Sequence, residues 1–170
     1  DLVRLTPSSS RSGNRHRTEA RTWFLDAARL LALPADPEEA AQEVLEGSTY
    51  GLGGIIGTAL SRTGPSDTLL VGMARSAVHD GGLGAMDALG GLRAAKDLLA
   101  HRSLGLVLAD DIALGGMNGA GAALTSITSI SPELAQELDR RACSRAMEVV
   151  SAAQGLDPGA VGPRRSLPVV

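Results

Sequence analysis

Short apolar runs alternate with amphipathic stretches along most of this chain. Two runs, at residues 68–72 and 104–109, are continuously apolar and bounded by turn residues, which is typical of strands buried in a parallel sheet. Elsewhere apolar residues recur at helical spacing, which predicts helices at residues 22–33, 37–45, 52–62, 83–89, 92–101 and 131–149. Residues 2–5 suit a short edge strand. The alternation predicts an α/β fold, a small, mostly parallel sheet with flanking helices.

Capping residues support several of these helix boundaries. Thr22 is a candidate N-cap for the first helix, which Pro34 would end. Asp36 precedes Pro37, and proline is favoured at the first position of a helix. Ser131 and the proline after it have the same arrangement at the start of the last helix. Residues 119–129, rich in small side chains, indicate neither a helix nor a strand.

Length and charge limit the domain organisation and the partners. At 170 residues the chain has room for one domain with a core, which we place at residues 21–153. Residues 1–20 and 154–170 are expected to be irregular tails. The net charge of −3 argues against a nucleic-acid partner, because a phosphate-binding surface usually needs a basic excess. The arginines near the N-terminus are separated by Ser, Gly and Asn, as in a solvated tail.

Cysteine content and hydropathy bear on the compartment. Cys143 is the single cysteine, so no intrachain disulfide can form, which favours a reducing, cytoplasmic setting. No apolar run approaches the roughly 18 residues that a membrane span needs, and no signal peptide is visible. We expect a cytoplasmic protein without a membrane partner. The sequence leaves open whether the chain forms a homo-oligomer.

The strongest candidate site is the loop from Met73 to Gly82. It follows one predicted strand and precedes a predicted helix. In open α/β sheets ligands bind at such positions, because backbone N–H groups and the helix dipole converge there. The loop has no Walker lysine and no dinucleotide fingerprint, so its glycines are weak evidence for a nucleotide.

Two motifs resemble the bacterial type I glycerate kinases, which phosphorylate glycerate with ATP. The family's T-S-Y-G-x-G-E segment corresponds to STYGLGG at 48–54, and its G-G-S-A-T-N-D-G-G-x-G loop to ARSAVHDGGLG at 74–84. Weaker similarity upstream and downstream extends the resemblance over residues 22 to about 150. The resemblance implies the inner α/β domain of those enzymes.

The departures from the family pattern concern phosphate chemistry. The glycine pair of the loop is replaced by Ala74 and Arg75, the threonine by Val78 and the asparagine by His79. The family's lysine-containing segment becomes residues 124–129, which carry no lysine, and several of its other motifs have no counterpart. Phosphoryl transfer depends on positive charge, Mg²⁺ ligands and a phosphate cradle. We therefore expect a stand-alone middle domain without kinase activity, and no cofactor unless the kinase alternative holds, which would require ATP and Mg²⁺.

The substituted positions suggest a more apolar ligand than glycerate. Side chains that are apolar where the family is small or polar favour aliphatic and methionine contacts: Met73, Val78, Leu83, Met117, Leu124 and Ile127. The predicted substrate-binding residues are Tyr50, Met73, Arg75, Ser76, Val78, Met117 and Asn118. The predicted catalytic residues are His79, Asp80, Asp110 and Asp111. No metal site is expected.

Each polar candidate also has a structural interpretation. His79 can move a proton near neutral pH, and Asp80 can stay ionised at a helix N-terminus. The alternative is that Asp80 is the N-cap of the helix and His79 an exposed loop residue. Asp110 and Asp111 could act as acid and base or cap a turn. Arg75 would clamp a carboxylate ligand, or pair with Asp80 or Asp111. Ser76 is favoured as a structural hydroxyl, because it lacks a nucleophile-elbow context.

Three functions remain open from the sequence. The first is a cofactor-independent isomerase, cyclase or lyase acting on a fairly apolar small molecule. The second is a fragment or subunit of an ATP-dependent glycerate kinase, a transferase. The third is a non-catalytic binding domain.

Overall fold

The computed structural model describes residues 1–5, 20–100, 102–114 and 119–154. Its sheet has four strands in the order β1 (Leu2–Leu5), β2 (Thr22–Asp26), β3 (Thr68–Gly72) and β4 (Ser103–Val107). β1 is antiparallel to β2, and the other two pairs are parallel. The helices are α1 (Pro37–Glu46), α2 (Tyr50–Arg62), α3 (Leu83–Ala88), α4 (Gly91–Leu99), α5 (Ala120–Ile127) and α6 (Pro132–Gln154). The predicted α/β fold with a mostly parallel sheet is confirmed.

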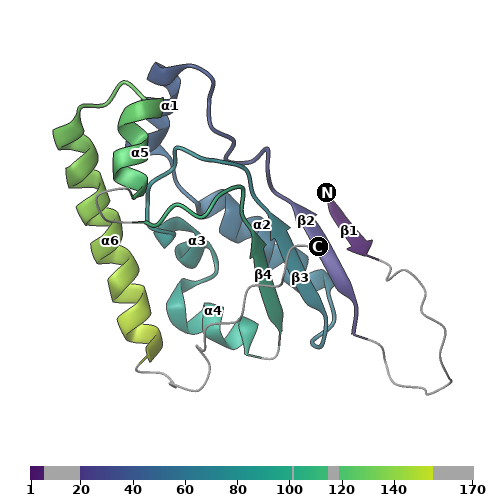
Figure 1. The fold of residues 1–170 in the computed structure, drawn as a ribbon. Coiled ribbons are helices and arrows are strands. Elements are labelled where there is room, and N and C mark those ends of the chain that lie inside the picture. The colour runs from purple at the N-terminus through teal and green to yellow at the C-terminus, as the bar shows by residue number, and fades with distance from the viewer. Residues whose placement is uncertain (6–19, 101, 115–118, 155–170) are drawn as a thin grey trace, which may run out of the picture.

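The described chain has two hydrophobic clusters, one against the sheet and one among the helices. Figure 1 shows α2 behind the sheet and α1, α5 and α6 together beyond the β4 edge. In the first cluster, Leu69 and Val71 of β3 pack with Leu60 of α2 and are almost fully buried. In the second, Ala40 and Val44 of α1, Leu124 of α5 and Ala77 of the loop after β3 pack together. The candidate loop is thus part of a core as well as part of the surface.

The predicted helix at 22–33 is wrong. Residues 22–26 form β2, which pairs with β1 on one side and β3 on the other, and a turn follows. Aromatic and β-branched side chains favour strands, and Trp23 Nε1 donates a hydrogen bond to Asp67 Oδ2 at 2.8 Å from within this strand. The apolar spacing that suggested a helix instead reflects Leu25 and Ala27 entering the same core. Pairing with β3 decided the structure of this segment.

The second apolar run forms a parallel strand, as predicted, but it is not a buried one. β4 is the last strand of the described sheet, and Leu106 and Val107 are 54% and 48% exposed. The edge strand at residues 2–5 and the strand at 68–72 are confirmed.

Most predicted helices are confirmed within one or two residues. The predicted caps of α1 and α6 are present, because Asp36 Oδ1 accepts from Glu38 and Glu39, and Ser131 Oγ accepts from Leu134. α6 reaches one residue into the predicted C-terminal tail, whose remainder at 155–170 lies outside the described residues, as do residues 6–19 of the predicted N-terminal tail. None of the described helices is long and apolar enough to cross a membrane.

Candidate functional site

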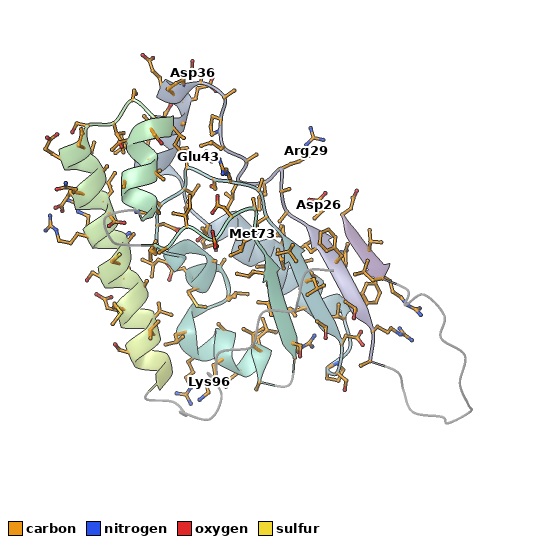
Figure 2. All side chains as sticks on the ribbon, viewed as in Figure 1. Asp26, Arg29, Asp36, Glu43, Met73 and Lys96 are labelled. Carbon is orange, nitrogen blue, oxygen red and sulfur yellow. The ribbon has the colours of Figure 1, made fainter. Side chains whose placement is uncertain are left out.

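A cavity of about 430 Å³ opens at the carboxyl ends of β3 and β4. The loop after β3 and the loop after β4 line it together with α5, and Figure 2 shows Met73 at that end of β3. Ligand sites in parallel sheets lie at such an end, so the predicted location is supported by the geometry. Apolar side chains form most of its wall: Leu33, Met73, Val78, Leu108, Ile112, Leu114, Leu124 and Ile127. The polar side chains are Arg75, Ser76, His79, Asp110 and Ser126.

The loop after β3 is held at several points by backbone contacts. Met73 donates its N–H to the Val107 carbonyl at 2.9 Å, and Leu33 donates to the Arg75 carbonyl at 2.8 Å. Two residues after Arg75, Ala77 is fully buried in the second core cluster. A wall anchored in this way is suited to holding polar groups in fixed positions.

Arg75 and Asp110 connect the two loops at the cavity. Arg75 Nε lies 3.1 Å from Asp110 Oδ2, and Asp110 Oδ1 also accepts from Ile112 N at 3.4 Å. Arg75 therefore pairs with neither Asp80 nor Asp111, the two partners weighed from the sequence. Its side chain is largely exposed, so the ion pair adds little stability. The guanidinium stays available to a ligand anion.

His79 is a buried histidine and not the exposed loop residue of the structural interpretation. Its side chain is 5% exposed and lines the cavity. Nε2 lies 3.6 Å from Oδ1 of Asp139 on α6, and neither atom has a hydrogen-bond partner among the described residues. Burial lowers the pKa of His79 below its usual value, and the carboxylates of Asp139 and Asp80 offset part of that shift.

Asp80 connects the beginnings of α2 and α3. Its Oδ2 accepts from the Thr49 N–H and the Thr49 hydroxyl, each at 2.8 Å, and from the Gly84 N–H at 3.1 Å. Its Oδ1 accepts from the Gly82 N–H at 2.9 Å. Desolvation would raise the pKa of Asp80, but these hydrogen bonds together lower it below its usual value. Asp80 does not line the cavity, so the geometry favours its capping interpretation over a catalytic one.

Gly81 allows the loop after β3 to pack closely against α6. Its φ of +68° lies in the left-handed region, where side chains are disfavoured. A Cβ at Gly81 would also lie 2.7 Å from the carbonyl oxygen of Ala142. The close approach brings α6 against the loop and places Asp139 beside His79.

Of the remaining predicted site residues, some line the cavity and others do not. Met73, Ser76 and Val78 line the cavity, and Ser76 Oγ also accepts from the Val78 N–H at 3.1 Å. Tyr50 is 60% exposed and Asp111 is exposed, and neither lines the cavity. Met117 and Asn118 lie outside the described residues.

The sequence did not point to Asp139 or to several residues that line the cavity, namely Leu33, Leu108, Ile112, Leu114 and Ser126. Leu33 precedes a proline and Leu108 lies shortly before the pair of aspartates at 110 and 111. Both belong to apolar stretches, whose spacing suggested core packing. Asp139 lies on α6 between polar neighbours, where it resembles any solvated helix residue. Only the packing of α6 on the loop identifies it.

Comparison with known proteins identifies the family of this chain. The sequence model of the glycerate kinase family matches residues 9–130, which include β2 to β4, α1 to α5 and the whole candidate loop. No curated protein and no solved structure gave a match. Asp139 lies beyond the matched residues. With most of its length matched, and with the expected loop at the ends of parallel strands, the chain belongs to the glycerate kinase family.

Proposed function

We propose that this domain binds a fairly apolar small molecule in the cavity after β3 and β4 and converts it without a cofactor. The reaction class is an isomerisation, cyclisation or elimination assisted by proton transfer and hydrogen bonding. The observation that carries the proposal is the composition of the cavity, in which a mostly aliphatic wall surrounds a histidine, an arginine and a carboxylate. Such pockets bind apolar ligands and orient them by a few polar groups.

Family membership favours a second candidate, an ATP-dependent glycerate kinase. The described residues fit ATP and Mg²⁺ poorly. Asp80 directs both oxygens to backbone and hydroxyl donors of its own chain, and Asp110 is paired with Arg75. No cluster of three or more His, Cys, Asp or Glu side chains in the described ranges is arranged to hold a metal ion. Lys96, the only lysine of the sequence, lies on α4 far from Met73 in Figure 2.

Within the proposal the polar residues have separate tasks. Arg75, which is paired with Asp110 and largely exposed, lines the cavity and would attract an anionic substituent of the ligand. Met73, Val78 and Leu124 supply apolar contacts, and His79 is the group able to exchange a proton near neutral pH.

Filling the cavity tests the binding part of this proposal. Ala74 is exposed and lines the cavity, so Ala74→Trp should occupy it at little cost in stability. We expect the neutral fluorophore N-phenyl-1-naphthylamine to bind the wild type and to bind this variant at least about tenfold more weakly, because a cavity-filling side chain displaces apolar contacts. Fluorescence titration measures both constants. The matched control is Ala113→Trp, which adds an indole to an exposed residue outside the cavity.

The charge part is tested by Arg75→Met with an anionic probe. Binding of 8-anilinonaphthalene-1-sulfonate should weaken about fivefold, since an exposed ion pair contributes about 1 kcal/mol. Binding of the neutral fluorophore should not change. Equal binding of either probe to wild type and Ala74→Trp would contradict the proposal. So would phosphorylation of glycerate by the purified chain with ATP and Mg²⁺.

A further inference from the structure

We propose that His79 is the general base of the cavity and that Asp139 of α6 is its positioning residue, acting on a ligand with an acidic C–H or O–H group. This inference rests on the function proposed above and adds the group that moves the proton. It also assigns a role to a residue outside the part of the chain matched to the family.

The facing atoms of the two side chains are close and buried, although the Asp139 side chain as a whole is 20% exposed. His79 Nε2 lies 3.6 Å from Asp139 Oδ1, and both atoms are buried without a hydrogen-bond partner among the described residues. Buried polar atoms without partners cost stability, so such a pair in a folded domain calls for a functional explanation. A small rearrangement would bring them within hydrogen-bonding distance.

The ring has two nitrogens with different surroundings. Nε2 faces Asp139, whereas the side chain as a whole lines the cavity. The proposal assigns Nδ1 to the cavity and Nε2–H to the carboxylate. A carboxylate that holds one nitrogen protonated leaves the other as an acceptor, which fixes the tautomer and the direction of proton transfer.

Backbone packing fixes the position of Asp139. Gly81 of the loop lies against the Ala142 carbonyl, one helical turn beyond Asp139. On the other side a Cβ at Gly121 of α5 would lie 2.6 Å from the Asp139 Cβ. The loop and α5 therefore hold α6 closely on both sides of the carboxylate, which is the rigidity that a positioning residue needs.

The protonation state suits a base. Burial lowers the pKa of His79, so the ring is neutral at physiological pH, and the anion of Asp139 stabilises the imidazolium formed after proton uptake. Asp80 on the same loop acts in the same direction. α5 contributes no titratable side chain. Arg75 and Asp110 also line the cavity. Glu43 of α1 has a buried Oε2 without a partner among the described residues, and its side chain and that of Val78 in the loop both lie close to Gly47.

The proposed step needs no second reactant. Nδ1 takes a proton from a carbon or oxygen of the ligand, and the electron pair of the broken bond stays on the ligand. The imidazolium returns the proton to a second atom of the same ligand, or to solvent after a bond within the ligand has broken. Isomerisation and elimination both satisfy this balance.

Elimination of 5-nitrobenzisoxazole provides a direct probe of such a base. A base removes the C3 proton while the ring N–O bond breaks, and the coloured 2-cyano-4-nitrophenolate is released. We expect the wild type to accelerate the reaction above buffer, with a rate that rises with pH and then levels off as His79 loses its proton. His79→Gln should lower this rate by about 100-fold, the usual contribution of a general base. An undiminished rate in His79→Gln, or no acceleration by the wild type, would overturn the inference.

The role of Asp139 is read from the pH profile. In Asp139→Asn the midpoint should move about 1 pH unit lower, because the opposite charge that supports the imidazolium is lost. Asp139→Glu keeps the charge and should restore the wild-type midpoint. Glu148→Gln, which removes an exposed acid from the same helix, should change nothing. An unchanged midpoint in Asp139→Asn overturns the assignment.

Two further measurements keep the outcomes distinct. If Asp139→Asn does not fold, the NMR titration of His79 in the wild type decides, and a second inflection from the coupled carboxylate is the expected result. A curve with one inflection counts against the pair. If N-phenyl-1-naphthylamine does not bind, the proposed function fails; if it binds and the elimination is insensitive to both variants, only this inference fails.

Discussion

Replacing Asp80 by alanine is expected to lower the free energy of unfolding by about 3 kcal/mol, because several donors lose one ionised acceptor. The N–H groups of Thr49, Gly82 and Gly84 and the Thr49 hydroxyl all donate to this carboxylate. These donors lie at the beginnings of α2 and α3, so the two helix ends lose the acceptor that they share. Urea denaturation followed by circular dichroism at neutral pH measures the change.

The matched control for this prediction is Asp111→Ala. Asp111 is exposed, and its removal should change the free energy of unfolding by no more than about 0.5 kcal/mol, as for most surface substitutions. An equal loss in both variants would show that Asp80 has no special structural role.

The Asp80 contribution should also depend on pH. The folded pKa is below the ordinary value of 3.8, so the unfolded state binds the proton first as pH falls. The difference between wild type and Asp80→Asn should therefore be constant well above pH 3.8 and shrink as pH drops through the folded pKa. A difference that grows on acidification would contradict the assigned hydrogen bonds.

Substitution of two adjacent glycines of α2 should have opposite effects. A Cβ at Gly53 would lie 2.7 Å from the Ala85 Cα of α3, whereas a Cβ at Gly54 would meet nothing within 4 Å. Gly53→Ala forces the two helix backbones apart and should lower the free energy of unfolding by about 2 kcal/mol. Gly54→Ala should raise it by about 0.5–1 kcal/mol, because alanine is the better helix former.

Thermal and urea denaturation of both variants measure this difference. Helix propensity is equal at the two positions, so the contrast isolates the contact between α2 and α3. Stabilisation by both substitutions would mean that the helices do not touch at Gly53. Because the candidate loop enters α3 directly, Gly53→Ala should also weaken binding of the neutral fluorophore, whereas Gly54→Ala should not.

Local patterns predicted the strand, the loop and the helix that make up the candidate site. The apolar run at 68–72, the glycines after it and the helix beyond have short-range signatures, and β3, the loop and α3 follow them. The capping residues Asp36 and Ser131 accept hydrogen bonds from residues two or three positions further along the chain, so their roles could also be predicted from the sequence. By contrast, residues 22–26 have spacing compatible with a helix, and the pairing with β3 overrides it.

The sequence by itself determined the α/β class, the family and the position of the loop after β3, because each depends on residues adjacent in the chain. Tertiary structure alone decided that Arg75 pairs with Asp110, that Asp80 joins two helices and that His79 is buried beside Asp139. These contacts join segments 31 to 60 positions apart, and their partners are ordinary polar residues in their local surroundings. The protonation of His79 depends on the packing of the helices, because desolvation lowers its pKa and the nearby carboxylate of Asp139 raises it. Neither effect exists before the helices have packed.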